Sequence, residues 1–520
     1  MASSYFYNVG SAFQVVAETH ANRVALAFPD GRRISYGELN GLSDRIARVL
    51  RGRGLARHSV VAIFNDKSAE AFASMIACLK LGIVYTNLDI TSPWARVEKM
   101  LKCCSPALVL HDGIDPEVEA GLASELGVAA LALGGPEFLD RVPGGGSDRP
   151  DLSEVTGGDP AYIMFTSGST GFPKGAVMSH ANVLNFARWG EDAIGVTHED
   201  VLTNVNPMYF DNSVFDFYVA LLNGATLCPL KPDPAGRTRN LVTAINELGC
   251  TVWFSVPSFL VYLLVTKALT RDDFSSITRI VFGGEGFPKP KLAELYALFA
   301  HRARLINVYG PTECTCICSA YDISEHDLED QTTLAPLGRI APNFDYIIDP
   351  VDGADPDTGE LCLGGPNVGL GYWRDPERTA RAFVQDPTGA GFRRILYRTG
   401  DLVARDENGL LHFRGRADNQ IKHMGYRIEL EEIEAGLNTL AYVAEAAVVY
   451  VRAESGPGKI VAFVGADHGV SPKTVANEIR KVVPPYMVPK DIHVLPFLPK
   501  NRNGKIDRAR LRDELAGELA

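Results

Sequence analysis

The chain has 520 residues, of which 46% are hydrophobic and 22% charged, and 63 acidic against 51 basic side chains give a formal net charge of −12. These proportions are typical of globular proteins and exclude a collagen-like helix, a coiled coil and wholesale disorder. Because the chain exceeds the usual size of one domain, we expect at least two domains.

Charge and apolar patterning also limit the partners. Lys and Arg form no concentrated block of the kind that neutralises phosphates, so we expect no nucleic-acid partner. No apolar stretch approaches the ~18–20 residues that cross a bilayer, and the first residues do not resemble a secretory signal. We therefore expect a cytoplasmic protein without membrane association. The 9 cysteines follow no small-scaffold spacing, which favours reduced thiols.

From about residue 20 to 410, short apolar runs alternate with longer amphipathic segments, as in parallel strands joined by helices. The apolar runs include residues 60–64, 107–112, 251–257, 279–285 and 304–311. Several end in Gly, Pro, Ser or acidic residues, and open α/β sheets bind ligands beyond the carboxyl ends of their strands. We therefore expect the functional site at those ends.

The pattern changes near residues 352–420, where Gly, Pro and Asp predict tight β-hairpins over 352–360, 364–372 and 406–420. The tail is predicted to hold a helix over 429–440, strands over 446–451 and 459–465, a helix near 471–483 and a strand near 490–497. The sequence thus predicts an α/β protein. Its large N-terminal domain, 1–416, has mixed and parallel sheets flanked by helices and a β-rich subdomain. A small, mobile α+β C-terminal domain spans 417–520.

The densest motif is YIMFTSGSTGFPKG, residues 162–175, in which an apolar strand leads into a loop of glycines and hydroxyls. Glycine permits close backbone approach and consecutive N–H groups form an anion nest, so this loop is suited to phosphate. Its spacing differs from GxxxxGK[ST], and a flexible polar turn is the alternative interpretation. The predicted phosphate ligands are Thr166, Ser167, Gly168, Ser169, Thr170, Gly171 and Lys174.

The loop resembles that of the adenylate-forming superfamily, which includes amino-acid adenylation domains of nonribosomal peptide synthetases, acyl- and aryl-CoA synthetases and luciferases. Further blocks match in the family's order along essentially the whole chain, and together they are highly specific. They are ISYGELN (34–40), LKLGIVYTNLD (79–89), YFDNSVFDFY (209–218), NVYGPTE (307–313), GELCLGGPNVGLGYWRDPERTARAF (359–383), YRTGDL (397–402), GRADNQIKHMGYRIELEEIE (415–434), VPPYMVP (483–489) and NRNGKIDR (501–508).

The resemblance implies that the chain uses ATP and Mg²⁺ to join a carboxylate to the α-phosphate and expel pyrophosphate. Its implied catalytic residues are Lys505, which bridges the carboxylate and the α-phosphate, Thr312 at the α-phosphate, and Glu313, which binds the Mg²⁺. The other nucleotide-binding residues implied are Tyr309 on the adenine, Asp401 and Arg416 at the ribose, and Gly284, Glu285 and Gly310.

Three of these residues also have a simpler structural interpretation. Glu313 could be a carboxylate at a helix N-terminus, where the dipole favours it. Asp401 could cap a turn, and Lys505 could be a solvated surface lysine. The surrounding YGPTE, YRTGDL and NGKID motifs favour the functional interpretation.

The resemblance also implies that the tail rotates between two reactions. Asp418 falls at the hinge position, and rotation about it exchanges Lys505 for the loop at Gly425, at which the thioester forms. Hinges concentrate backbone change in a few residues at element ends. Many relatives carry a basic residue before that glycine, whereas this chain has Met424.

Asp211 in YFDNSVFDFY matches the aspartate that pairs with the substrate ammonium in amino-acid-activating relatives. A carboxylate in an apolar pocket is costly unless a cation meets it. The alternative interpretation is that Asp211 caps the start of the next helix. By resemblance the remaining side-chain pocket is Asn212, Phe215, Phe254, Val281, Gly283, Val308, Cys316 and Ile317. Because none of them is charged, we expect the substrate's side chain to be neutral. Phe215 and Phe254 should shorten the cavity, and Gly283 should open one of its walls.

The segment CTCIC, 314–318, alternates cysteine with other residues, which predicts a strand with three thiols on one side. Zinc sites usually space their ligands as C-x₂₋₄-C with a second pair, which is absent here. Buried thiols that pack as small hydrophobes are the favoured interpretation.

The function predicted is activation of a small-to-medium neutral amino acid as aminoacyl-AMP, followed by transfer to the phosphopantetheine thiol of a carrier protein in trans. No carrier motif of the LGG-x-S type follows NGKIDRARL, so we expect the acceptor on another chain. Alternatives are a D-alanine:carrier ligase, suggested by FDNSVFD and GGEGFP, a CoA ligase for a non-amino acid, and a non-catalytic protein that retains the fold.

Overall fold

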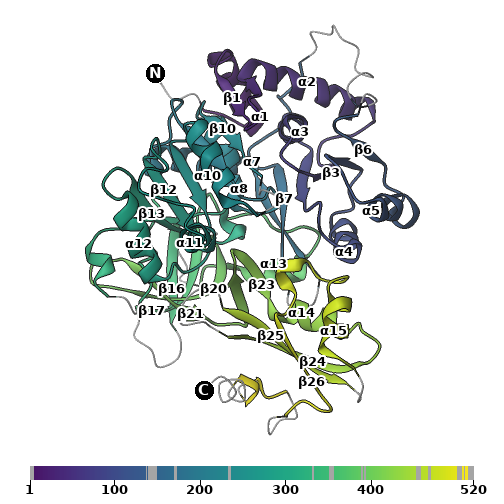
Figure 1. Ribbon diagram of the computed structural model, residues 1–520. Helices are drawn as coiled ribbons and strands as arrows, with labels where there is room; N and C mark the ends of the chain where they lie inside the picture. The colour runs from purple at the N-terminus through teal and green to yellow at the C-terminus, as the bar shows by residue number, and fades with distance from the viewer. Residues whose placement is uncertain are drawn as a thin grey trace.

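The structure, a computed structural model, describes residues 5–135, 138, 149–168, 172–231, 236–330, 333–350, 357–387, 391, 394–451, 458–466, 470–500, 506–508 and 510–512. Two extended sheets and an antiparallel subdomain form the large domain, and the tail forms a small domain below them (Figure 1). This arrangement confirms the predicted α/β fold class. Among the described residues, no helix has both the length and the apolarity needed to cross a membrane.

The largest sheet has nine strands and is parallel through its centre, from β13 to β1, with antiparallel strands at both edges. In spatial order it consists of β15 (Arg339–Ile340), β14 (Ser319–Asp322), β13 (Arg304–Tyr309), β12 (Arg279–Gly283), β11 (Val252–Ser255), β9 (Val201–Asn204), β10 (Thr226–Pro229), β1 (Val24–Ala27) and β2 (Arg33–Ser35).

A seven-stranded sheet carries the phosphate-loop motif at the end of its longest strand. In spatial order it consists of β18 (Gly371–Tyr372), β8 (Lys174–Ser179), β7 (Pro160–Thr166), β4 (Val84–Leu88), β3 (Val60–Phe64), β5 (Leu108–His111) and β6 (Ala130–Ala132). The strands β3, β4 and β5 are buried along their whole length, as expected for a parallel sheet covered on both faces.

Helices cover and separate these sheets. They are α1 (Val9–Thr19), α2 (Tyr36–Gly52), α3 (Ala69–Leu81), α4 (Trp94–Cys104), α5 (Pro116–Gly121), η1 (Leu122–Leu126), α7 (His180–Trp189), η2 (Gly190–Ile194), α8 (Asn212–Val214), η3 (Phe215–Val219), α9 (Ala220–Leu222), α10 (Thr238–Glu247), α11 (Pro257–Val265), α12 (Lys289–Phe299), η4 (Thr312–Cys314), η5 (His326–Leu328) and α13 (Pro376–Ala382). Local sequence fixes where two of these helices begin: Ser35 and Glu38 form a capping box on α2, and Ser179 and Asn182 form another on α7.

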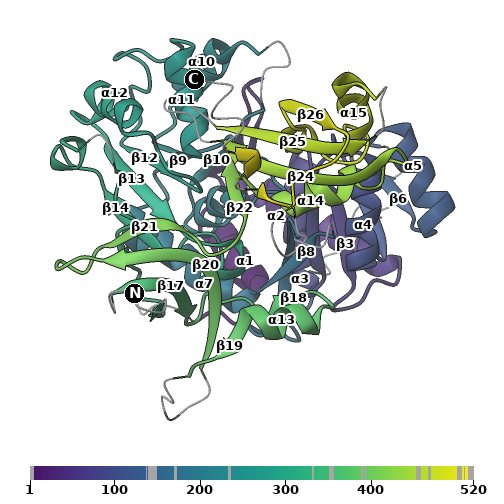
Figure 2. The same ribbon diagram turned by 90° about the horizontal axis from the view of Figure 1, so that it is seen from below.

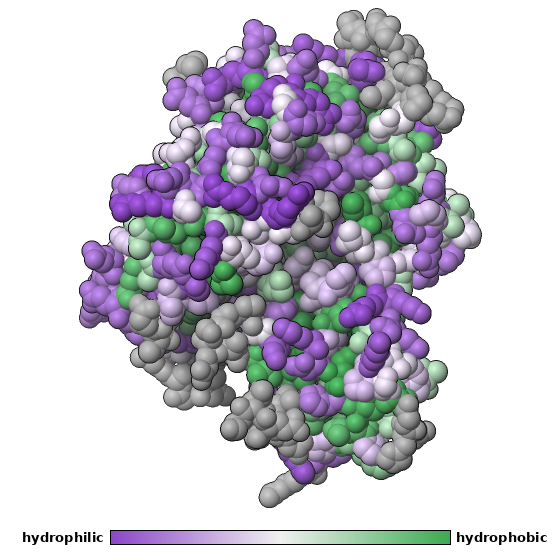
Figure 3. Space-filling view, viewed as in Figure 1, coloured by the Kyte–Doolittle hydropathy of each residue, from purple (hydrophilic) through white to green (hydrophobic). Residues whose placement is uncertain are grey.

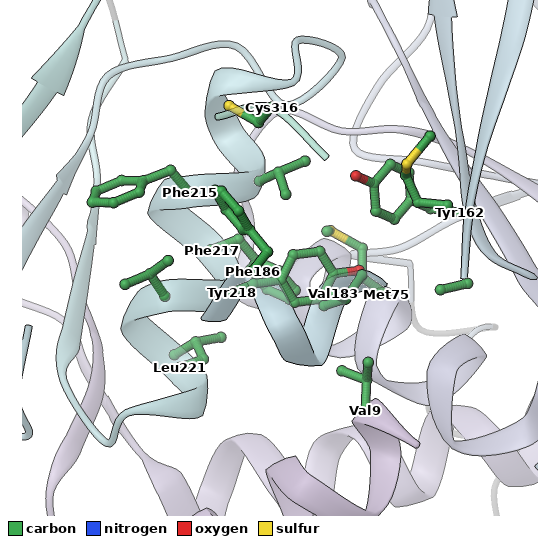
Figure 4. Close-up of a cluster of buried hydrophobic side chains, with 14 of the residues drawn as sticks. Val9, Met75, Tyr162, Val183, Phe186, Phe215, Phe217, Tyr218, Leu221 and Cys316 are labelled. Atoms are coloured by element: carbon green, nitrogen blue, oxygen red, sulfur yellow. The ribbon is translucent and has the colours of Figure 1, made fainter. Parts of the chain in front are cut away.

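The main core lies between the two large sheets. Aromatic side chains of η3 and α7 meet there, with Phe215 and Phe186 packed edge to face at 6.5 Å between ring centroids. Tyr162 of β7 and Met75 of α3 close the cluster from the other side (Figure 4). This shared core fixes the carboxyl end of β7 relative to the segment that begins at Asp211.

The antiparallel subdomain and the small domain complete the chain. The subdomain consists of β16 (Asp345–Pro350), β17 (Thr358–Gly364), β20 (Ile395–Arg405), β19 (Phe383–Gln385) and β21 (Leu411–Arg416). The small domain consists of the hairpin β22 (Gln420–His423) and β23 (Tyr426–Glu429), then α14 (Leu430–Leu437), β24 (Val443–Val451), β25 (Lys459–Ala466), α15 (Pro472–Ile479), η6 (Pro485–Met487) and β26 (Asp491–Leu495). Seen from below, it covers the space between the two large sheets (Figure 2), and apolar residues gather on its face (Figure 3).

One hairpin prediction is wrong. Residues 364–372 do not fold back on themselves, because β18 pairs antiparallel with β8, far away in the sequence. Gly371, the first residue of β18, has a φ of 112°, which favours glycine, and the hydroxyl of the next residue, Tyr372, donates to the buried Glu313. The prediction used local turn composition, which carries no information about a distant partner strand.

Candidate functional site

A pocket lies where the carboxyl ends of β7, β11 and β13 meet the β22–β23 hairpin of the small domain. The large domain lines it with residues that include Arg96, Thr166, Ser167, Tyr209, Phe210, Asp211, Asn212, Phe254, Gly284, Val308, Tyr309, Gly310, Thr312, Cys316, Ile317, Thr399, Asp401 and Arg416. The small domain contributes Gln420, Lys422, Gly425, Tyr426, Arg427 and Tyr486. Motifs distant in the sequence therefore face one cavity at the strand ends, where the sequence predicts the site.

The phosphate loop begins where β7 ends. A Cβ at Gly168 would lie 2.0 Å from the carbonyl oxygen of Phe172, so only glycine fits this turn. Ser167 Oγ donates to the Arg427 carbonyl at 2.7 Å and accepts from the Glu429 N–H at 3.1 Å. The loop therefore holds the small domain in this arrangement. Ser169, Thr170 and Gly171 lie outside the described residues.

Glu313 is fully buried behind the loop. Its carboxylate accepts from the Tyr372 hydroxyl at 2.8 Å and from Arg427 Nη1 at 2.6 Å. Burial acts to raise the pKa of this carboxyl, but Arg427 and Lys174 outweigh it and lower the pKa to about 2. Glu313 is thus a stable anion whose ion-pair partner, Arg427, belongs to the small domain.

The opposite end of the pocket carries the residues that the resemblance assigns to the nucleoside. Tyr309 donates to Asp401 at 2.6 Å, and Arg416 Nη1 donates to the other carboxylate oxygen at 2.6 Å. Asp401 lies within β20 and caps no turn. Lys422 lies 5.3 Å from the centre of the Tyr309 ring, a cation–π distance. Arg416 also donates twice to Asp418, the residue predicted to be the hinge.

Asp211 lies at the start of α8 but does not cap it, because its side chain makes no capping hydrogen bond. It instead accepts a hydrogen bond from Thr312 across the pocket. Burial raises the pKa of this carboxyl, against the smaller effects of Thr312 and Arg427. A cation placed beside Asp211 would relieve that cost of burial.

The walls near Asp211 are uncharged: Asn212, Phe254, Val308, Cys316 and Ile317 all line the pocket. Phe215, Val281 and Gly283 are not among the lining residues, and Phe215 packs behind Phe254 at 5.0 Å between ring centroids. The expectation that Gly283 gives the substrate room is wrong here. A Cβ at Gly283 would lie 2.3 Å from Val308 O, so this glycine serves the close pairing of β12 with β13.

The cysteine segment is not the predicted strand. Residues 312–314 form the short helix η4, and Thr315 and Cys316 have φ of 60° and 74°. The chain therefore turns tightly here, and a strand begins only at Ser319. All three thiols are buried, and burial raises the pKa of each of them above its ordinary range.

The turn between β22 and β23 reaches the pocket. Met424 and Gly425 have φ of 51° and 81°, the left-handed pair of a tight hairpin turn. The Gly425 N–H donates to Glu285 Oε2 at 3.0 Å, and a Cβ on Gly425 would lie 2.5 Å from a Val256 methyl. Glu285 thus holds this turn and is not among the residues that line the pocket.

Lys505 and residues 501–504 lie outside the described residues, so its implied catalytic role stays a prediction. The chain on either side is described: Lys500 forms an isolated bridge with Ile506. Leu498 and Leu511 pack with residues of β24 and β25 into one apolar cluster. The described residues of this segment, 498–500, 506–508 and 510–512, are not among those that line the pocket.

Sequence reasoning missed Lys422, Arg427 and Glu429 as individual site residues. Pairing of β22 with β23 places Lys422 opposite Arg427 and Gln420 opposite Glu429, so these four polar side chains share one face. The alternation of polar and apolar residues over 420–429 could have predicted that these side chains lie together. No such pattern in the sequence pointed to Arg96 of α4.

Comparisons with known proteins agree with this geometry. The family model described as AMP-binding enzyme matches residues 13–373, and the AMP-binding enzyme C-terminal domain matches residues 432–505. The solved structure of IdnL1 is 29% identical with a TM-score of 0.78, covering 96% of this chain and 100% of that chain.

Two curated relatives differ in how much of their length this chain spans. Bacitracin synthase 1 of Bacillus licheniformis is 33% identical over 96% of this chain, which spans only 9% of that protein. The D-alanine--D-alanyl carrier protein ligase of the same species is 31% identical over 96% of this chain and 98% of the ligase. Because a family model matches most of the chain and the pocket brings the family's motifs together, the chain belongs to the AMP-binding enzyme family of adenylate-forming ligases.

Proposed function

We propose that this chain activates a neutral amino acid of small to medium size as its aminoacyl-adenylate and transfers it to the phosphopantetheine thiol of a carrier protein in trans. The observation that carries the proposal is Asp211, a half-buried carboxylate beside uncharged pocket walls, whose pKa is raised by burial. A substrate ammonium would offset the cost of burying this charge, whereas a fatty or aryl acid would leave it unpaired. This distinction favours an amino acid over the other acids that the family activates.

In the proposed first step, a carboxylate oxygen of the amino acid attacks the α-phosphorus of ATP and pyrophosphate leaves. Asp401 would accept hydrogen bonds from the ribose hydroxyls, and the Tyr309 ring would lie on the adenine. Thr312 would contact the α-phosphate. It already reaches Asp211 by a hydrogen bond, which supports a carboxylate and an α-phosphate meeting at this point. Fixed donors aimed at developing charge are the main source of such catalysis.

The residues present fit Mg²⁺, which prefers hard oxygen ligands. Glu313 is an ionised carboxylate, and the buried Thr166 hydroxyl oxygen has no hydrogen-bond partner among the described residues. These two side chains would hold the ion once Arg427 withdraws. Bound there, Mg²⁺ would supply positive charge to the phosphates.

Lys505 would bridge the two reacting anions during adenylation, after rotation at Asp418. The arrangement described here places the Gly425 turn at the pocket instead, as the resemblance implies for thioester formation. Contact of that turn with Glu285 and Val256 supports the transfer step.

A D-alanine:carrier-protein ligase is a second candidate. The observation in its favour is that this chain matches a D-alanine ligase over 98% of that enzyme's length. D-alanine therefore belongs in the substrate panel.

Amino-acid-dependent exchange of pyrophosphate into ATP tests the proposal. Exchange with one or a few neutral amino acids supports it, and exchange with D-alanine alone selects the second candidate. Exchange only with fatty or aryl acids would favour a CoA ligase. No exchange with any acid would favour a non-catalytic protein.

A further inference from the structure

The end of strand β11 that reaches the pocket is held on one side by side chains. Towards β12, every residue of β11 pairs with the neighbouring strand. Towards β9, the register contains a single pair, Val252 with Leu202. Phe254 lies beyond that pair and lines the pocket. Its position therefore depends on contacts other than a continuous strand ladder on that side.

Three side chains make these contacts, and we call them the clamp: Thr203, Asn206 and Asp216. The Phe254 N–H donates to Thr203 Oγ1 at 3.4 Å, and the Phe254 carbonyl accepts from Asn206 Nδ2 at 3.0 Å. The same Nδ2 donates to Asp216 Oδ2, also at 3.0 Å. Because both neighbours of this nitrogen are acceptors, the Asn206 amide has one orientation, with both of its hydrogens used.

Asp216 joins the Phe254 wall to the segment that carries Asp211. It lies in η3, directly after Phe215, whose ring packs against the Phe254 ring at 5.0 Å between centroids. This helical segment begins at Asp211. All three clamp residues are buried. The clamp therefore fixes Phe254 relative to Asp211, the residue proposed to bind the substrate ammonium.

The environment of Asp216 is not one that stability alone would favour. Its Oδ2 also accepts from Asn204 Nδ2 at 3.0 Å, whereas its buried Oδ1 has no hydrogen-bond partner among the described residues. Burial raises the pKa of this carboxyl, against the hydrogen bonds from Asn204 and Asn206 and the charge of Lys67. A buried carboxylate with an unpaired oxygen costs free energy that an apolar residue would avoid. Its presence here supports a positioning role.

We infer that the clamp sets the size of the amino-acid side chain that the pocket accepts, because it fixes the Phe254 wall relative to Asp211. The inference rests on the proposed function, since that function places the substrate between these two residues. None of the clamp residues is among those that line the pocket. They act through Phe254 and are positioning residues.

The test uses pyrophosphate exchange to compare the preferred amino acid with its homologue that is one methylene longer. The measured quantity is the kcat/KM of the first divided by that of the second, and one methylene makes it roughly ten- to two-hundredfold. Asn206→Ala should lower this ratio by about five- to tenfold, the factor that one hydrogen bond contributes. KM for ATP should stay within about twofold of the parent's, because the nucleoside end of the pocket is untouched.

Thr203→Val serves as a second variant because it keeps the side-chain volume, so the test does not depend on the folding of Asn206→Ala. It removes the acceptor for the Phe254 N–H and should lower the ratio in the same direction.

Asp216 offers a matched pair of variants. Asp216→Leu removes the acceptor and should lower the ratio as much as Asn206→Ala. The double variant should lower it no further, because both residues act through one carbonyl. Asp216→Asn should keep the parent's ratio, since one side-chain oxygen can still accept both hydrogen bonds.

Asp200→Asn is the control for a merely structural effect. Asp200 is buried at the opposite end of the same two strands, where it accepts from Thr251 at 2.7 Å. This variant should lower the unfolding temperature and leave the ratio unchanged.

An unchanged ratio in Asn206→Ala and Thr203→Val, or an equal fall in Asp200→Asn, would overturn the inference and leave the proposed function intact. If the parent exchanges only with fatty or aryl acids, the proposed function fails. The ratio for two such acids that differ by one methylene then tests the clamp in the same way. No exchange with any acid would overturn both.

Discussion

Arg427 of β23 donates to Glu313 of η4 at 2.6 Å, across 114 positions of sequence, and this contact joins the small domain to the centre of the site. Glu313 is fully buried, the Arg427 side chain is 17% exposed, and the pair is bounded by Tyr372 and Tyr397. The contact makes the ionisation of Glu313 depend on the position of the small domain.

Arg427→Met should therefore change the pH dependence of stability. The pKa of Glu313 is lowered to about 2 from an ordinary 4.5. The pair's stabilisation is thus fully present above about pH 4.5 and is lost as pH falls towards 2. Removing Arg427 should cost on the order of 3 kcal/mol near neutral pH and abolish this dependence between those values.

Unfolding temperatures from neutral pH down to about pH 2.5 would measure this effect. Arg405→Met, which removes an arginine paired with Asp357 at the surface, is the matched control. The same pH dependence in Arg427→Met and the parent would contradict the coupling.

Asp211→Asn should lower kcat/KM for the preferred amino acid by about a hundredfold, because the ammonium loses a charged partner. The deaminated analogue, which has no ammonium, should react poorly with the parent and no worse with the variant. Pyrophosphate exchange measures both. Equal activity of the parent with the amino acid and its deaminated analogue would show that Asp211 has another role.

Lys505→Ala should abolish adenylation while leaving ATP binding within about threefold of the parent, because the lysine acts on the reacting centre. Lys500→Ala is the control from the same segment, where Lys500 pairs with Glu445. Pyrophosphate exchange separates the two variants. Undiminished exchange in Lys505→Ala would remove this residue from the mechanism.

Gly168→Ala should weaken binding of ATP by about tenfold or more, because the new methyl group would meet the Phe172 carbonyl and force the loop to move. Gly41→Ala, with open space around its Cβ position, should leave binding unchanged. Calorimetry with ATP measures both. Equal affinity in the two variants would show that the loop adapts without cost.

The sequence predicted most strongly what local pattern encodes. Buried parallel strands such as β3 appear as continuous apolar runs, and the phosphate loop follows such a strand. The strand predicted for the cysteine segment was wrong because alternation suggested a strand, whereas tertiary contacts hold Thr315 and Cys316 at positive φ. The contacts of Arg96 with Glu432 and of Arg427 with Glu313 could not be predicted, since they depend on how two domains dock.

The central claim is that a carboxylate oxygen of an amino acid attacks the α-phosphorus of ATP in this pocket. Turnover of the preferred amino acid, labelled with ¹⁸O in its carboxylate, with ATP and a carrier thiol tests it most directly. The account predicts one labelled oxygen in the AMP released and none in pyrophosphate. Unlabelled AMP, or label in a phosphate product, would contradict it.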